Sequence, residues 1–257
     1  MTGFPDQAAA GDDAIALAPL PWDSGILGYR CGALSFRPSF PDGGTRAAHA
    51  LGDALARARR EGFRFLTAKV EVGRTGLSNL CLGGGGFLAD TEVCFSKRPE
   101  RPQLQESAAA SCITSAAFWD DSLCDVAQTL NLSRFFRDPR IGAPAAERLW
   151  RESIRNHCGG RASYSVICFR DSLPAGFINV VEREGISNIF IIGVLPQYQG
   201  QGLGSLMIRY YESNLSGAVN EMTVDTQLSN IMAQKLYVST GYRIIKSQHI
   251  IHFWLSD

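Results

Sequence analysis

The sequence predicts an α+β protein with a mixed central sheet, and three patterns carry this prediction. Apolar runs bounded by short turns predict consecutive strands at 163–170, 174–182 and 187–196. Helical and strand-like segments then alternate, at 203–215, 221–226, 229–241 and 243–255. Two helical segments precede these strands, at 116–130 and 144–158. Together they predict an α+β domain over residues 108–257.

A smaller α/β block is predicted for residues 1–100. An extended stretch at 14–36 leads through a Pro- and Gly-rich turn into a helix at 46–62, where Ala and Leu recur at three- and four-residue spacing. The predicted strands of this block are 63–72 and 87–98, with a short helix between them. We expect a linker at 99–107 and a domain boundary near residue 100.

The two blocks share an arrangement of elements. Sliding the first block by about 155 positions lays its strand, polar loop, short helix and Gly86-Phe87 onto a strand, loop, helix and Gly241-Tyr242 of the second. This match predicts a degenerate internal duplicate, although two unrelated strand–helix–strand units would look the same. Only the second block holds candidate catalytic groups.

Composition restricts the classes of partner. The chain has 257 residues, 45% of them hydrophobic, which supports a substantial core. Its 25 basic and 25 acidic side chains create no general field, so neither nucleic acid nor an anionic membrane is expected as a partner. Seven cysteines without a C-x-x-C pair, a flexible start without signal-peptide features and no long apolar run predict a cytoplasmic protein.

The most informative stretch is residues 194–205, in which a strand end, a proline and three glycines precede a helix. No Lys follows these glycines, so a P-loop is excluded, and Ser205 occupies the place of the third glycine of a dinucleotide fingerprint. Small side chains at a helix N-terminus instead suit a pyrophosphate, which backbone N–H groups would bind. A tight turn that merely begins the helix is the alternative interpretation.

Two motifs resolve this choice. Gln199, Gly202 and Gly204 resemble the [QR]-x-x-G-x-[GA] signature of the GNAT acetyltransferase superfamily. Asn230, Ala233 and Tyr237 are similar to its N-x-x-A-x-x-x-Y helix. The resemblance covers residues 108–257 and implies a GNAT fold, with acetyl-CoA as co-substrate and no metal.

The resemblance also implies roles for individual residues. Tyr237 matches the general acid that protonates the departing CoA thiolate, and a backbone N–H near Gly193 or Val194 would stabilise the oxyanion. The residues expected to bind acetyl-CoA are Ile192, Gly193, Val194, Gln199, Gly200, Gln201, Gly202, Leu203, Gly204, Ser205, Asn230 and Ala233.

The general base stays open. Asn188 occupies the position at which many members carry Glu, so a water relay, a carboxylate such as Glu182, or an amine that is already neutral would serve instead. His249 and His252 are three residues apart on a predicted strand and face opposite sides, which argues against a metal pair. We expect both to be structural.

A narrower resemblance concerns the acceptor. Segments 19–34, 86–98 and 133–156 are similar to the TDP-fucosamine acetyltransferases, which acetylate the amino group of a nucleotide-linked deoxy sugar. This resemblance implies that Arg134, Arg137 and Trp22 contact such a substrate, with arginine on the diphosphate, although core packing or solvated charge would also explain them. A different small-molecule amine and a non-catalytic CoA-binding module are the alternatives, and a homodimer is compatible with the family.

Overall fold

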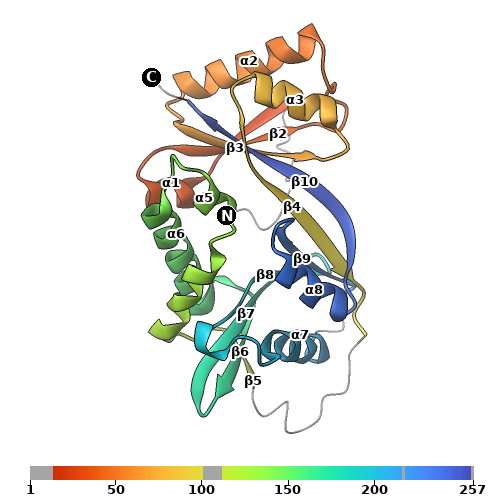
Figure 1. Cartoon of the computed structure of the whole chain (residues 1–257). Helices are drawn as coiled ribbons and strands as arrows, with labels where there is room; N and C mark the ends of the chain where they lie inside the picture. The colour runs from red at the N-terminus through yellow and green to blue at the C-terminus, as the bar shows by residue number, and fades with distance from the viewer. Residues whose placement is uncertain (1–13, 101–111, 216–217, 256–257) are drawn as a thin grey trace. The chain divides into compact units, whose positions relative to one another are not determined.

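The computed structural model describes residues 14–100, 112–215 and 218–255. Within these ranges ten strands form one mixed sheet in the order β1-β2-β3-β10-β4-β9-β8-β7-β6-β5, which confirms the predicted α+β class (Figure 1). The flexible start and most of the linker predicted at 99–107 lie outside the described residues.

The chain divides into two compact units that interleave in sequence. Unit 1 takes in the described parts of 1–92, 133–145 and 246–257, and unit 2 those of 93–132 and 146–245. The predicted boundary near residue 100 does not coincide with the division into compact units, because each unit contains residues from before and after that position.

Unit 1 is a sheet with two helices packed on it. Its strands are β1 (Ile15–Pro19), β2 (Cys31–Phe36), β3 (Phe65–Glu71), the first part of β4 (Phe87–Lys97) and most of β10 (Arg243–Trp254). β2 pairs antiparallel with β1 and parallel with β3, and β10 pairs antiparallel with β3. Helices α2 (Thr45–Arg60) and α3 (Thr75–Gly83) cover this sheet, and Leu51, Leu77, Leu66 and Ile251 lie in their common core.

The prediction of a continuous extended stretch at 14–36 is wrong for its middle part, which is helical. Residues Pro21–Leu27 form helix α1 between β1 and β2. Pro21 stands at the start, where proline needs no N–H partner, and Gly28 ends the helix in the left-handed region with φ 79°. These are standard helix-end signals, and seven residues were too short for a clear apolar period.

Unit 2 contains the strands predicted for the second block except the last, which is β10 and lies mostly in unit 1. They are β6 (Tyr164–Arg170), β7 (Leu173–Arg183), β8 (Ile186–Val194) and β9 (Glu221–Gln227), with β5 (Cys112–Ser115) as an additional strand that was not predicted. Helices α7 (Leu203–Ser213) and α8 (Ile231–Ser239) contribute Met207, Tyr211 and Tyr237 to the core on one face.

The remaining helices partly differ from the predictions. Helix α6 (Ala143–Asn156) is where it was expected and continues as a π-helical turn, η2 (His157–Arg161). The helix expected at 116–130 is a 3₁₀ helix, η1 (Asp121–Leu130), and α5 (Arg134–Arg137) is a single turn that no pattern indicated. Among the described residues, no helix combines the length and apolarity that a membrane crossing requires.

The predicted duplicate is visible in the order of elements. β3, α3 and β4 in the first copy correspond to β9, α8 and β10 in the second. The last strands of the copies are exchanged, because β10 pairs with β3 while β4 lies next to β9 in the sheet order. This exchange explains why the C-terminal residues belong to unit 1.

Asp138 fixes the segment 133–145 within unit 1. Its Oδ2 accepts hydrogen bonds from His252 Nδ1 at 2.8 Å and from Trp254 Nε1 at 2.9 Å, both on β10. Burial raises the pKa of Asp138, but these hydrogen bonds outweigh burial and hold it below its usual value. Burial lowers the pKa of His252, so the imidazole is neutral and donates through Nδ1.

We expect Asp138→Ala to lower the free energy of unfolding by about 3 kcal/mol at pH 7, because two buried donors lose a charged acceptor. The difference should shrink as the pH falls through the lowered pKa of Asp138, since that carboxylate then loses its charge in the parent protein. Asp42→Ala is the control, because Asp42 forms an exposed ion pair with Arg74 and should cost less than about 1 kcal/mol. Equal losses in urea denaturation would contradict this account.

Candidate functional site

The parallel strands β8 and β9 separate part-way along their length. Their paired residues run from Ile186 opposite Glu221 to Ile189 opposite Val224. Beyond that point β8 continues to Val194 and β9 to Gln227. The backbone of Ile192, Gly193 and Val194, predicted to bind the co-substrate, therefore lies past the last β8–β9 pair. Peptide groups released from a ladder in this way are available to a ligand.

A bulge in β8 lies at the same point. Asn179 of β7 is opposite Ile191 and Val180 is opposite Ile189, so Phe190 is an extra residue without a partner. Just beyond it, Gly193 lies under η1, where an added Cβ would be 2.2 Å from Val126 Cγ1. Gly193 thus has a packing requirement that its sequence motif did not indicate.

The predicted loop forms a short connection from β8 to α7. A 3₁₀ turn, η3 (Pro196–Tyr198), follows β8, and Gln199 Nε2 donates to the carbonyl oxygen of Val194 at 3.1 Å. The signature glutamine therefore ties the loop to the strand end. Gln201 Nε2 donates to the carbonyl oxygen of Gln197 at 3.4 Å.

Gly202 is the N-cap of α7 and explains the need for glycine. Its φ of 78° lies in the left-handed region, it provides no side-chain cap, and nothing lies within 4 Å of an added Cβ. The first N–H groups of α7 thus receive no bond from a capping side chain. Leu203 is buried in the core, Gly204 packs against Leu236 of α8, and Ser205 follows in the first turn. This geometry suits the pyrophosphate expected here.

In unit 1, the loop between β2 and α2 corresponds to the loop between β8 and α7, and side chains and backbone of α3 pack against it. Arg74, at the start of α3, forms an ion pair with Asp42 and donates to the carbonyl oxygen of Phe40. An added Cβ at Gly76 would lie 2.3 Å from the carbonyl oxygen of Asp42. The loop between β2 and α2 therefore packs directly on the start of α3.

Tyr237 lies on the inner side of α8. It is 2% exposed and packs against Phe95 and Tyr242, at ring-centroid distances of 5.5 and 6.0 Å. Burial, with a smaller effect from the charge of Asp225, raises the pKa of Tyr237 above its usual value. The hydroxyl therefore keeps its proton at neutral pH, which a general acid requires.

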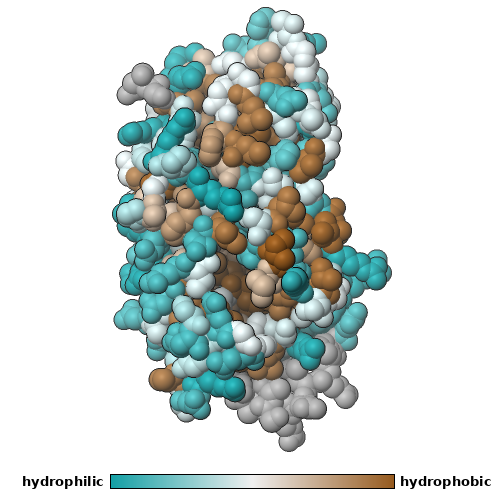
Figure 2. Space-filling view, viewed as in Figure 1, coloured by the Kyte–Doolittle hydropathy of each residue, from teal (hydrophilic) through white to brown (hydrophobic). Residues whose placement is uncertain are grey.

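The outer side of α8 is apolar as well. Ile231, Met232 and Val238 are exposed, and Figure 2 shows brown side chains at the place of α8 in Figure 1. The other motif residues act on the helix itself: Asn230 is its N-cap, and Asn230 Oδ1 accepts from the Ala233 N–H at 3.2 Å. The N-x-x-A spacing is thus a helix cap, and a role of either residue in binding stays a prediction.

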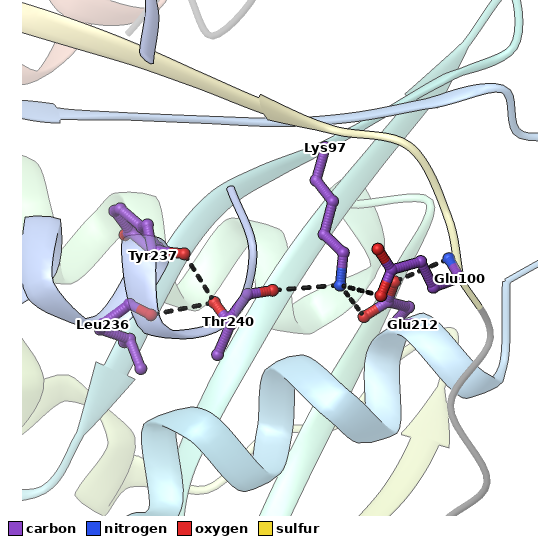
Figure 3. A network of polar contacts seen from close by, with 6 residues as sticks. All are labelled: Lys97, Glu100, Glu212, Leu236, Tyr237 and Thr240. Atoms are coloured by element: carbon purple, nitrogen blue, oxygen red, sulfur yellow. Dashed lines mark hydrogen bonds and ion pairs between the residues drawn. The ribbon is translucent and has the colours of Figure 1, made fainter. Parts of the chain in front are cut away.

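A buried ion pair holds the C-terminal end of α8 (Figure 3). Lys97 Nζ is 2.9 Å from Glu212 Oε2 of α7 and donates to the carbonyl oxygen of Thr240 at 3.0 Å. Thr240 Oγ1 in turn donates to the carbonyl oxygens of Leu236 and Tyr237. Lys97 thus places a positive charge at the negative end of the helix that carries Tyr237.

The residues considered for the general base lie on different faces of the sheet. Asn188 is on β8, as expected, and Asn188 Nδ2 donates to Thr223 Oγ1 at 2.9 Å. Its neighbour Ser187 faces the opposite side of the sheet, where its hydroxyl contacts Tyr211 of α7. Glu182 accepts from Ser187 on that side, so it does not share the face of Asn188. Asp225, two residues beyond Thr223, is a carboxylate on the face of Asn188 that the sequence analysis did not consider.

The predicted acceptor residues belong to unit 1. Trp22 is in α1, while Arg134 and Arg137 begin and end the short helix α5. Arg134 is 9% exposed and lies over the ring of Phe135, whereas Arg137 is exposed. The structure thus groups these three residues in one unit and the loop and Tyr237 in the other.

The two histidines of β10 have separate partners. His249 Nδ1 is 3.1 Å from Thr91 Oγ1, while His252 Nδ1 bonds to Asp138. Both therefore have the structural partners expected of them.

Comparison with known proteins identifies the same region. Residues 161–244 match the acetyltransferase (GNAT) domain family. The spore coat polysaccharide biosynthesis protein SpsD of Bacillus subtilis is 25% identical over 136 residues, which cover 52% of this chain and 47% of SpsD. The match thus spans about half the length of that curated relative.

Solved structures resemble the whole described fold. A functionally unknown conserved protein from Staphylococcus epidermidis has a TM-score of 0.64 at 12% identity, covering 96% of this chain and 93% of its own. A GCN5-related N-acetyltransferase from Sphaerobacter thermophilus has a TM-score of 0.59 at 13% identity, covering 95% and 78%. A tandem GNAT protein from the clavulanic acid biosynthesis pathway has a TM-score of 0.54 at 13% identity, covering 96% and 85%. The fold is therefore like that of tandem GNAT proteins.

Gly202→Asp should weaken acetyl-CoA binding at least about 10-fold more than Gly202→Asn, because only Asp adds a negative charge beside the expected pyrophosphate. Both residues tolerate the left-handed backbone better than other side chains do. Gly62→Asp is the control, since Gly62 has the same φ of 78° and equally open surroundings in unit 1. Calorimetry that finds equal affinities for the Asp and Asn variants would place the pyrophosphate elsewhere.

Tyr237→Phe should leave folding and acetyl-CoA affinity intact while turnover falls roughly 100- to 10,000-fold, the range for a positioned acid. Tyr242→Phe is the matched control, because Tyr242 is the adjacent core tyrosine and its buried hydroxyl has no hydrogen-bond partner among the described residues. Stopped-flow measurement of thiol release compares the turnover of the two variants with that of the parent enzyme. Parent-like turnover in Tyr237→Phe would make Tyr237 a packing residue.

Proposed function

We propose that this chain, whose residues 161–244 match the acetyltransferase (GNAT) domain family, is an N-acyltransferase that moves the acetyl group of acetyl-CoA directly onto the amino group of a TDP-linked amino-deoxy sugar. The observation that carries the transferase part is the separation of β8 from β9 immediately before the glycine loop. Because of this separation, the backbone of residues 191–194 and the first N–H groups of α7 are both available to a ligand, and they are close in sequence.

The chemistry follows from these parts. The backbone of residues 191–194 holds the pantetheine arm and orders the thioester, while the N-terminus of α7 binds the pyrophosphate. The amine attacks the thioester carbonyl, and a backbone N–H near Gly193 stabilises the oxyanion that forms. Tyr237, which stays protonated because it is buried, gives its proton to the CoA thiolate.

The acceptor assignment is supported by two observations. The curated relative SpsD is named for polysaccharide biosynthesis, a process in which sugars are substrates. In unit 1, in addition, the loop between β2 and α2 is closed by the contacts of Asp42 with Arg74 and Gly76, and we assign the surface of this unit to substrate recognition or assembly. Arg137, the exposed arginine of α5, is the better candidate for the diphosphate, because Arg134 is nearly buried.

One observation favours a second candidate, an N-acyltransferase for another small amine. Asn188 occupies the position of the usual acidic residue, cannot take a proton from an amine and bonds to Thr223 instead. The site therefore does not select an acceptor whose amine must be deprotonated at that position. We further place the reaction in the cytoplasm, since all seven cysteines are free, and we assign the exposed apolar side of α8 to a homodimer contact.

The acceptor is tested by comparing kcat/KM for the TDP-linked and the free amino sugar. Remote binding energy at the nucleotide should make the free sugar at least about 100-fold poorer. Arg137→Ala should reduce only the TDP-linked value, by about 10- to 100-fold, while Arg140→Ala, an exposed neighbour, should not. Equal values for the two sugars in the parent enzyme would support the second candidate.

A further inference from the structure

His157 lies at the point where β8 leaves β9. Its ring stacks on that of Phe190, with centroids 4.1 Å apart and an interplanar angle of 24°. Phe190 is the extra residue of the β8 bulge and directly follows Ile189, the last residue of β8 that pairs with β9. The imidazole is therefore beside the stretch of β8 that is proposed to hold the thioester.

The local backbone is unusual at this residue. Helix α6 ends at Asn156, and His157 begins the π-helical turn η2, in which Gly160 has φ 111°. Turns of this kind cost stability and are frequent at functional sites. Ile189 packs in the core with Tyr237 and α7, so its neighbours Asn188 and Phe190 face the opposite side of the sheet. The imidazole that stacks on Phe190 is therefore on the side without Tyr237 and α7.

The hydrogen bonds of His157 determine its tautomer. Nδ1 lies 2.8 Å from the carbonyl oxygen of Ser153 and so carries the proton that it donates. Nε2 is then the acceptor nitrogen, because both contacts of the ring with Ser153, to its carbonyl oxygen and to its hydroxyl, involve Nδ1. Burial, with a smaller effect from the Arg161 charge, lowers the pKa of His157 to about 4, so the ring is neutral at pH 7.

A buried polar atom of Asn179 lacks a partner among the described residues. Asn179 Oδ1 accepts from Ser165 Oγ and Cys158 Sγ, but Asn179 Nδ2 is buried and unpaired among the described residues. Buried donors are normally satisfied, so a polar group of a substrate or a water molecule belongs here. Cys158 directly follows His157, so the same π-helical turn carries the imidazole and one of the two groups that bond to Asn179.

We propose that His157 Nε2 accepts the proton of the acceptor amine during acetyl transfer, which rests on the proposed function. The amine nitrogen forms a bond to the thioester carbon and its proton passes to Nε2. The C–S bond then breaks, and the thiolate takes the proton of Tyr237. His157 returns its proton through water to the Tyr237 phenolate, so an amide and CoA thiol are the net products. A neutral imidazole is competent for this step because the attacking nitrogen becomes strongly acidic as its bond to carbon forms.

The test compares three variants with the amine on which the parent enzyme is most active. His157→Asn keeps an N–H for the Ser153 carbonyl and His157→Phe keeps a ring against Phe190, but both lack Nε2, so each should lose about 100-fold or more in kcat with acetyl-CoA affinity unchanged. His157→Ala should regain at least about 10-fold of its lost rate, saturably, when free imidazole is added. His49→Ala, at an exposed histidine of α2, should show neither effect.

Two outcomes would overturn the inference: parent-like kcat in His157→Phe, or no imidazole rescue of a folded His157→Ala. Failure of the proposed acceptor is a separate result. In that case the parent uses a different amine, and the same variants still test His157 on that amine.

Discussion

The end of the β8–β9 pairing at Ile189 and Val224 is the constraint on which the candidate site depends. A continuous ladder would satisfy the backbone of residues 191–194 internally and leave nothing for a thioester substrate. The bulge at Phe190 turns the strand at the same point, and the contact between Val126 and Gly193 holds η1 against it. Strand separation, bulge and helix start therefore lie together within residues 189–203.

Two copies of one strand–helix–strand unit have diverged in the use of their loops. In the second copy, Gly202 begins α7 without a capping side chain, so the helix N-terminus is available to an anion. In the first, Arg74 and Asp42 fill the equivalent region and the loop packs on α3. Exchange of the last strands means that neither copy completes its sheet alone. The degenerate copy is thus retained as structure even though its own ligand loop is closed.

Buried charges are used where elements distant in sequence must be held in one place. Lys97 joins β4 to α7 and to the end of α8, and Asp138 joins the chain after α5 to β10. Burying such groups costs desolvation energy, so hydrophobic packing would serve stability equally well. Hydrogen bonds, unlike hydrophobic contacts, depend on direction and so fix the position of the groups that they join. The Lys97 ammonium and the Thr240 hydroxyl thereby hold the end of α8, the helix that carries Tyr237.

The sequence by itself determined the fold class and the order of strands and helices in the second block, because these depend on local periodicity. It also located the glycine loop directly before a helix, where the structure has the start of α7. It did not predict α1, η1 as a 3₁₀ helix, or β5, since short segments have too few residues for a clear period. It did not indicate that Asn230 caps α8, a role that the structure adds to the binding role predicted for this residue.

Only the tertiary structure decided which groups meet. The exchange of β4 and β10, the burial of Arg134, and the separation of Glu182 from the face of Asn188 depend on strand pairing between distant segments. His157 and Phe190 are joined in the same way, by a stacking contact that no spacing in the sequence encodes. Local propensity acts within a turn or two of chain, whereas burial and hydrogen-bond satisfaction are properties of the packed whole.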